Sequence, residues 1–176
     1  MNDDLRALVR TIPDYPEPGV QFRDITTLLL DGAGFRTSIE RMAAQIGPTP
    51  DLIAGIEARG FIFGAALAQV LGCGLVLLRK KNKLPDRVTG INYALEYGQD
   101  RIEMHSDAVA PGARVVLVDD LIATGGTAMA GVDLLESAGA RVDLAAFVID
   151  LPDLGGAARL RGRGIAVSAL MAFEGD

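Results

Sequence analysis

Short apolar runs alternate along this chain with longer stretches of helical periodicity. The apolar runs have strand length and cover residues 52–56, 75–78, 115–118, 144–149 and 165–170. The helix-like stretches cover residues 35–46, 61–71 and 128–138. Strands that are apolar on both faces are typical of a parallel sheet covered by helices on both sides. The pattern therefore predicts an α/β fold with a central, mostly parallel, five-stranded sheet flanked by helices.

Two segments fall outside this alternation. Residues 12–30 begin with prolines at positions 13, 16 and 18, and we expect them to form an ordered arm. Residues 79–104 are basic at first and then alternate between apolar and polar positions on both sides of a turn near Gly98. This pattern predicts a basic loop followed by a β-hairpin. A long excursion in a compact domain is usually functional, so we expect residues 79–105 to act as a lid.

Length and composition limit the class of protein. A chain of 176 residues predicts one domain over residues 1–176, in which residues 1–34 and 150–173 form a small hood. The net charge of −6 argues against a nucleic-acid or anionic-membrane partner, because both need Lys and Arg gathered on one face. The single Cys73 cannot form an intramolecular disulfide, and residues 1–10 lack the apolar core of a signal peptide. We expect a cytoplasmic protein.

The clearest chemical motif is RVVLVDDLIATGGTA at residues 114–128, which is a strand ending in Asp119 and Asp120, a small-residue turn and a helix start. Glycines, threonine hydroxyls and free helix amides are the components of a phosphate-binding loop. Two carboxylates would repel a bare phosphate, but they accept hydrogen bonds from a vicinal diol. A phosphorylated sugar meets both requirements, whereas the alternative is that the two acids only cap the turn.

A second junction between strand and helix lies at residues 55–64, where Arg59 follows the strand. Taken alone, such a turn more often marks only the start of a helix. A second phosphate-binding junction at the same edge of a parallel sheet would suit a pyrophosphate group. Arg59 is the candidate for that contact.

Residues 114–128 resemble the phosphoribosyl pyrophosphate (PRPP) signature of type I phosphoribosyltransferases, in which hydrophobic residues precede two acids and a Thr-Gly-Gly-Thr loop. A resemblance to the adenine phosphoribosyltransferases of that family spans nearly the whole chain. Its further segments are TIPDYPEPGVQFRDIT at 11–26, EARGF at 57–61, RKKNKLP at 79–85, YALEYG at 93–98 and DLGG at 153–156. The resemblance implies the type I phosphoribosyltransferase fold and an enzyme that converts adenine and PRPP into AMP and pyrophosphate.

The resemblance also implies roles for the residues that match the PRPP site. Asp119 and Asp120 would bind the ribose hydroxyls. The positions that would bind the 5-phosphate are Ala123, Thr124, Gly125, Gly126 and Thr127. Those that would bind pyrophosphate are Arg59, Lys80 and Lys83, together with Arg79 from the partner subunit of a homodimer. Mg²⁺ would arrive with PRPP and take no ligand directly from the protein.

The same resemblance implies how the base is held. Adenine would pack beside Phe22 and be recognised largely by the backbone of Gln21 and Arg23. Glu96 would be the catalytic residue that exchanges a proton with the purine imidazole, and Tyr97 would belong to the closing lid.

Some alternatives stay open at this point. Gln21, Asn82 and Asp86 depart from the residues expected in the family, which leaves details of the base pocket undetermined. A hypoxanthine-guanine, xanthine or orotate transferase would share the PRPP signature, and so would a regulator that binds PRPP without catalysis. Arg79 could instead pair with an acid of its own subunit. His105, without a second ligand residue nearby, is expected to be structural.

Overall fold

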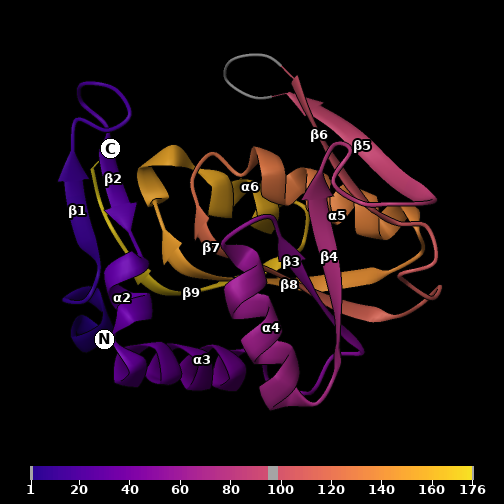
Figure 1. The fold of residues 1–176 in the computed structure, drawn as a ribbon, viewed down its shortest axis with the longest axis horizontal. Helices are drawn as coiled ribbons and strands as arrows, with labels where there is room; N and C mark the ends of the chain where they lie inside the picture. The colour runs from indigo at the N-terminus through magenta and orange to yellow at the C-terminus, as the bar shows by residue number, and fades with distance from the viewer. Residues whose placement is uncertain (1, 95–98, 176) are drawn as a thin grey trace.

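A computed structural model describes residues 2–94 and 99–175 of the chain. It has three layers, in which a mixed sheet lies between helices on its two faces (Figure 1). Helices α3 (Gly32–Ile46) and α4 (Gly60–Leu71) pack on one face, and their apolar side chains share a core with the sheet. Helices α5 (Gly126–Ser137) and α6 (Gly156–Gly162) contribute to a second core on the other face. The predicted α/β fold is confirmed.

Five parallel strands form the centre of the sheet, in the order β4-β3-β7-β8-β9. Their bounds are Leu52–Ile56 for β3, Gly74–Lys80 for β4, Arg114–Ile122 for β7, Arg141–Asp150 for β8 and Ala166–Ala172 for β9. Each includes one of the five predicted apolar runs, apart from Ile165, which directly precedes β9. Strands that are buried on both faces can therefore be located in the sequence as continuous apolar runs.

The predicted hairpin extends this sheet at one end. Strands β5 (Val88–Ala94) and β6 (Gln99–His105) pair with each other, and β6 pairs antiparallel with the end of β4, where Arg79 lies opposite Glu103. Among the described residues the sheet therefore has seven strands, two more than the five parallel ones predicted. The difference arises because a polar strand end pairs through backbone groups, which apolar patterning does not reveal.

The N-terminal arm forms a separate small sheet of β1 (Arg10–Pro13) and β2 (Gln21–Asp24), preceded by α1 (Asp3–Arg6) and followed by α2 (Thr26–Leu30). Figure 1 shows this sheet and the β5–β6 hairpin on opposite sides of the molecule. Of residues 150–173, the segment that forms β9 lies in the main sheet and not in the arm, after the short η1 (Pro152–Leu154) and α6. Within the described residues, no helix is long and apolar enough to cross a membrane.

Strands are added to the sheet in opposite directions from β3 and from β7, although the two strands are parallel to each other. From β3 the chain crosses to β4 through α4 on one face, whereas from β7 it crosses to β8 through α5 on the other face. In such sheets ligands bind in the crevice beyond the carboxyl ends of the two strands at the switch point. The ends of β3 and β7 carry the two junctions singled out in the sequence, so the fold brings them together.

Helix α4 begins in close contact with the end of β7. A Cβ atom on Gly60 would lie 2.8 Å from the Val118 carbonyl oxygen and 2.8 Å from Asp119 Oδ1. Contacts this short with backbone atoms require a shift of either the helix or the strand. Glycine at position 60 therefore sets how closely the first junction approaches the second.

We predict that Gly60→Ala destabilises the protein by about 1–3 kcal/mol, because the added methyl group overpacks this contact. Gly32→Ala is the matched control: Gly32 also begins a long helix, but its Cβ would meet nothing within 4 Å. Its melting temperature should be unchanged or slightly higher, because alanine favours helix. Thermal unfolding of both variants tests this, and equal melting temperatures would contradict it.

Candidate active site

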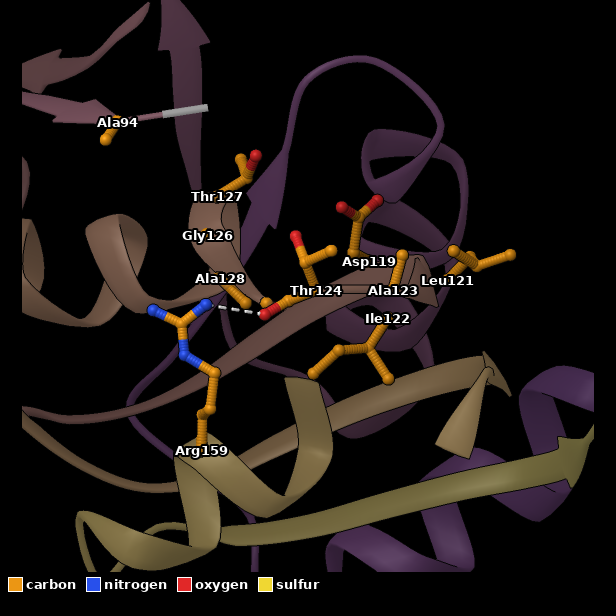
Figure 2. A pocket seen from close by; sticks show the side chains of 11 residues that line it. Ala94, Asp119, Leu121, Ile122, Ala123, Thr124, Gly126, Thr127, Ala128 and Arg159 are labelled. Atoms are coloured by element: carbon orange, nitrogen blue, oxygen red, sulfur yellow. Dashed lines mark hydrogen bonds between the residues drawn. The ribbon is translucent and has the colours of Figure 1, made fainter. Parts of the chain in front are cut away.

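The two acids predicted to bind ribose lie at the carboxyl end of β7. Asp120 is buried, with 3% of its surface exposed, and Asp119 is half-buried and faces a cavity (Figure 2). The Asp120 backbone N–H donates to Asp119 Oδ1 at 2.8 Å. Arg59 Nε, from the second junction, lies 2.8 Å from Asp120 Oδ2. Arg59 thus pairs with the second of the two neighbouring carboxylates.

The electrostatics of this pair are unfavourable in the free protein. Burial raises the pKa of Asp119 well above its usual value, and the negative charge of Asp120 raises it further. Burial also raises the pKa of Asp120, although Arg59 acts in the opposite direction. Carboxylates held in such surroundings are stabilised by a ligand that brings hydroxyl donors or a cation.

The loop after β7 has the geometry of an anion site. Residues 123–127 line a cavity of about 240 Å³ together with Asp119, Ala94 and Arg159 (Figure 2). Gly125 has a φ of +80°, and α5 begins at the next residue without a side-chain cap. The first backbone N–H groups of a helix have no partner within the helix, so they are available to an anion here.

Arg59 connects this region to the N-terminal arm. The guanidinium lies over the Phe22 ring, 5.7 Å from its centroid, while its Nε faces Asp120. It follows a cis peptide bond between Glu57 and Ala58. The predicted base residue, pyrophosphate residue and ribose residue are therefore neighbours in space.

The other two arm residues are held differently. Gln21 and Arg23 flank Phe22 on β2, and all three are half-buried. The Arg23 side chain donates to Thr11 Oγ1 at 2.7 Å and lies over the Phe173 ring, with its CZ atom 4.8 Å from the centroid. That side chain fixes the arm against the C-terminal segment.

Arg79 of the predicted lid is engaged with an acid of its own chain. Arg79 Nε lies 3.3 Å from Glu57 Oε2, and its Nη1 donates to the Lys83 carbonyl oxygen at 2.9 Å. This pairing is the alternative in which Arg79 contacts an acid of its own subunit. The Lys83 residue itself is exposed.

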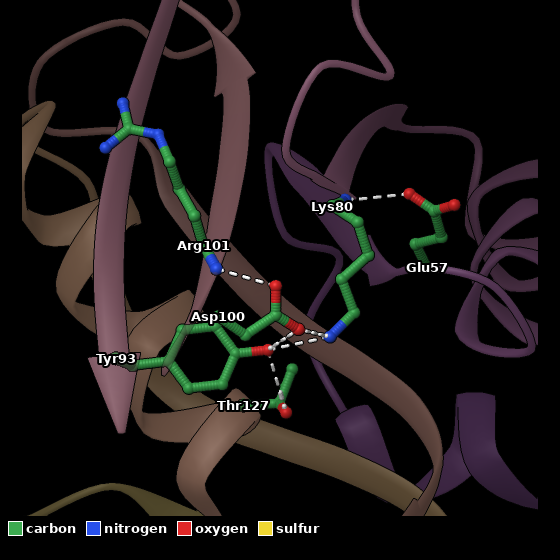
Figure 3. A network of polar contacts seen from close by, with 6 residues as sticks. All are labelled: Glu57, Lys80, Tyr93, Asp100, Arg101 and Thr127. Atoms are coloured by element: carbon green, nitrogen blue, oxygen red, sulfur yellow. Dashed lines mark hydrogen bonds and ion pairs between the residues drawn. The ribbon is translucent and has the colours of Figure 1, made fainter. Parts of the chain in front are cut away.

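Lys80 takes part in a network that joins the hairpin to the loop after β7 (Figure 3). Its Nζ pairs with Asp100 and donates to Tyr93 Oη at 2.9 Å, and Thr127 Oγ1 donates to the same Tyr93 oxygen at 3.3 Å. The Lys80 ammonium holds the pKa of Asp100 below its usual value. Two strands of the hairpin, the end of β4 and the start of α5 are thereby linked.

Several contributors to the site were not predicted. Asp100, Tyr93 and Glu57 hold the basic residues, and Arg159 of α6 lines the cavity. The alternation that predicted the hairpin places Tyr93 on a strand but does not indicate what it contacts. The predicted Glu96 and Tyr97 lie outside the described residues. Among the described residues, no cluster of three His, Cys, Asp or Glu side chains could hold a metal ion.

Comparisons with known proteins agree with this geometry. Residues 26–161 match the family model described as a phosphoribosyl transferase domain. The chain is 58% identical over 174 residues to the adenine phosphoribosyltransferase of Sphingopyxis alaskensis, covering 98% of this chain and 95% of the relative.

Solved structures show the same likeness. The adenine phosphoribosyltransferase of Thermoanaerobacter pseudethanolicus is 46% identical with a TM-score of 0.93, covering 98% of this chain and 100% of that one. The Saccharomyces cerevisiae enzyme, complexed with adenine and an imino-altritol bisphosphate, is 34% identical with a TM-score of 0.89, covering 96% and 97%.

The raised pKa of Asp119 predicts that Asp119→Asn stabilises the free protein. A carboxyl whose pKa is raised by folding contributes stability below its unfolded pKa and loses it as pH rises through the folded value. The variant should therefore melt higher than the natural protein at pH 8, by about 2–4 °C for each kcal/mol gained, and the difference should shrink near pH 4.

Asp143→Asn on β8 is the control, because that side chain is 65% exposed. Thermal melts of the three proteins without ligand, at both pH values, provide the measurement. An Asp119→Asn protein that is less stable than the natural one at pH 8 would show that burial does not strain this carboxylate.

Proposed function

The chain belongs to the adenine phosphoribosyltransferase family, and we propose how its residues carry out the family's reaction, in which adenine and PRPP give AMP and pyrophosphate. It is a purine-salvage glycosyltransferase. In the reaction, N9 of adenine bonds to C1 of the ribose, the bond from C1 to the pyrophosphate oxygen breaks, and the purine imidazole loses a proton. The observation that carries this function is the common cavity of Asp119 and the loop 123–127 at the switch point.

PRPP would lie across the two junctions. Asp119 and Asp120 would accept hydrogen bonds from the ribose hydroxyls, which relieves the electrostatic cost of the pair. The 5-phosphate would bind to the amides and hydroxyls of residues 123–127. In this arrangement C1 would lie on the side of the β3 junction, next to Arg59.

Pyrophosphate would be bound by residues that must first exchange their partners. Arg59 would leave Asp120 as ribose hydroxyls take its place, and Lys80 would leave Asp100. Lys83 is exposed on the same loop and can join them. The leaving group is thus neutralised by cations that the free enzyme keeps paired, and such electrostatic stabilisation lowers the barrier to bond cleavage.

Mg²⁺ fits this site as an ion carried by PRPP. The acid pair lies where ribose oxygens would be, and in the described residues no set of protein ligands could hold the ion on its own. Mg²⁺ commonly keeps several waters and binds substrate phosphates with few protein ligands. When bound, it would supply positive charge to the diphosphate and ribose oxygens.

Adenine would pack beside Phe22, next to the Arg59 guanidinium, with the backbone of Gln21 and Arg23 at its edge. Glu96 would accept the proton from N7 while N9 forms the new bond. This role rests on the resemblance, in which Glu96 is the glutamate of the YALEYG segment. Tyr97 would help the closed lid to exclude water.

A cytoplasmic location and the lack of a nucleic-acid or membrane partner are part of this proposal. The net charge of −6 supports it, because anionic polymers and surfaces repel an acidic protein. Burial raises the pKa of the Cys73 thiol, which keeps it protonated and unreactive.

An isotope assay tests the function directly. With PRPP and Mg²⁺, labelled adenine should give AMP, whereas hypoxanthine, guanine and orotate should react at least about 100-fold more slowly. Chelation of Mg²⁺ should abolish turnover. Faster reaction of another base would identify a different phosphoribosyltransferase, and PRPP binding without turnover of any base would indicate a regulator.

A homodimer completes the proposal. Ile62 and Val70 of α4 and Leu75 and Leu77 of β4 are exposed by 36–53%, although they are large and apolar. Exposed apolar patches of this kind mark interaction surfaces. β4 leads directly from this patch into Arg79, which in a dimer formed through the patch would contact the neighbouring subunit's pyrophosphate.

Subunit mixing tests whether Arg79 acts in trans. Arg79→Ala and the double variant Asp119→Ala/Asp120→Ala should each be inactive alone. After subunit exchange in equal amounts, about half of the dimers are heterodimers with one intact site of two, so about a quarter of the natural activity should return. Heterodimers that form without recovery would place Arg79 in its own subunit's site, and a monomeric mass by light scattering would exclude the dimer.

A further inference from the structure

Residues 151–159 contact the end of β7 and the loop 123–127 through three hydrogen bonds. The proposed reaction gives this segment no role. The Leu151 N–H donates to the Ile122 carbonyl oxygen at 3.0 Å, and the Gly156 N–H donates to the Ala123 carbonyl oxygen at 3.0 Å. Both contacts are made by backbone, so they depend on the path of the chain and not on a side chain.

Gly156 allows this approach because it has no side chain. A Cβ atom there would lie 2.3 Å from the Ala123 carbonyl oxygen and 2.7 Å from the Gly125 nitrogen. In the other direction, a Cβ on Gly125 would lie 2.9 Å from Gly156 Cα. The start of α6 and the loop are therefore in direct backbone contact, which accounts for the DLGG segment at 153–156.

The third contact between residues 151–159 and the loop is made by a side chain. Arg159 Nη1 donates to the Thr124 carbonyl oxygen at 2.8 Å, as Figure 2 shows. The C=O and N–H of a trans peptide point in opposite directions, so holding this oxygen also fixes the direction of the Gly125 N–H. Gly125 itself imposes little, because glycine occupies positive and negative φ with similar ease.

The charge of Arg159 remains available to a ligand. Arg163, one turn further along the chain, is neutralised by Asp133 and Glu136 of α5. Arg159 instead contacts a carbonyl oxygen, which is neutral, and it lines the cavity beside residues 123–128. A cation at this place strengthens every interaction of the cavity with an anion.

We propose that Arg159 is a positioning residue for the 5-phosphate of PRPP. It orients the Thr124–Gly125 peptide of the loop and adds positive charge to the cavity that the phosphate enters. This inference rests on the proposed function, because it takes residues 123–127 as the 5-phosphate site. It goes beyond that function in assigning a specific task to a residue of α6 that does not belong to the PRPP signature.

Calorimetric titration with ribose 5-phosphate and, separately, with pyrophosphate tests the proposal on the whole enzyme. Arg159→Ala should weaken ribose 5-phosphate binding roughly 3- to 30-fold, the loss of one hydrogen bond and a nearby charge, and leave pyrophosphate binding unchanged. The KM for PRPP should rise by a similar factor while the KM for adenine stays the same. Arg159→Lys should recover part of the loss, because it keeps the charge but not the planar fork.

Arg161→Ala is the matched control. Arg161 lies on the same helix and contacts the Val167 carbonyl oxygen at 3.5 Å, away from the loop 123–127. This variant should bind ribose 5-phosphate as the natural protein does.

Unchanged ribose 5-phosphate binding in Arg159→Ala would overturn the proposal, and so would equal weakening of both ligands, which would indicate a general loss of packing. If Arg159→Ala does not fold, the same titrations are made with Arg159→Gln, which keeps a donor for Thr124 without the charge. This variant should also bind ribose 5-phosphate more weakly than the natural protein and bind pyrophosphate equally well. A natural protein that fails to bind ribose 5-phosphate would contradict the proposed function itself, independently of Arg159.

Discussion

Two carboxylates at the end of one buried strand, with a single arginine beside them, are the constraint on which the rest of the site depends. Asp120 is nearly inaccessible and Asp119 faces the cavity, and burial raises the pKa of both. Arg59 compensates only part of this cost. The free protein is therefore less stable than an apolar or neutral arrangement would make it, which is common at functional sites. In the proposed function, the vicinal hydroxyls of ribose would remove this cost by donating hydrogen bonds to the two carboxylates.

The same constraint explains why the neighbouring cations are paired in the free protein. Arg59 is held by Asp120, Arg79 by Glu57 and Lys80 by Asp100. Unpaired cations close together would repel one another, and these carboxylates offset that repulsion. Tyr93 of the hairpin accepts hydrogen bonds from both Lys80 and Thr127, so the network joins the hairpin directly to the loop after β7.

Close backbone contact holds the two junctions and α6 in one place. Gly60 allows α4 to begin against the end of β7, and Gly156 allows α6 to begin against the loop 123–127. Neither position tolerates a Cβ without movement of backbone. The parallel sheet fixes the two junctions and the start of α6 relative to one another, so the loops need few contacts of their own to remain in position.

The sequence by itself determined the five parallel strands, the three long helices and the identity of the acid pair and the loop 123–127, because burial on both faces and phosphate-loop chemistry are local patterns. Only the tertiary structure decided which partners the charged side chains have. The Lys80–Asp100 pair, the Arg159 contact with Thr124 and the Arg59 contact with Asp120 join residues 20, 35 and 61 positions apart, respectively. Such pairs depend on strand order and on the face from which each helix approaches, and neither leaves a periodic signal along the chain.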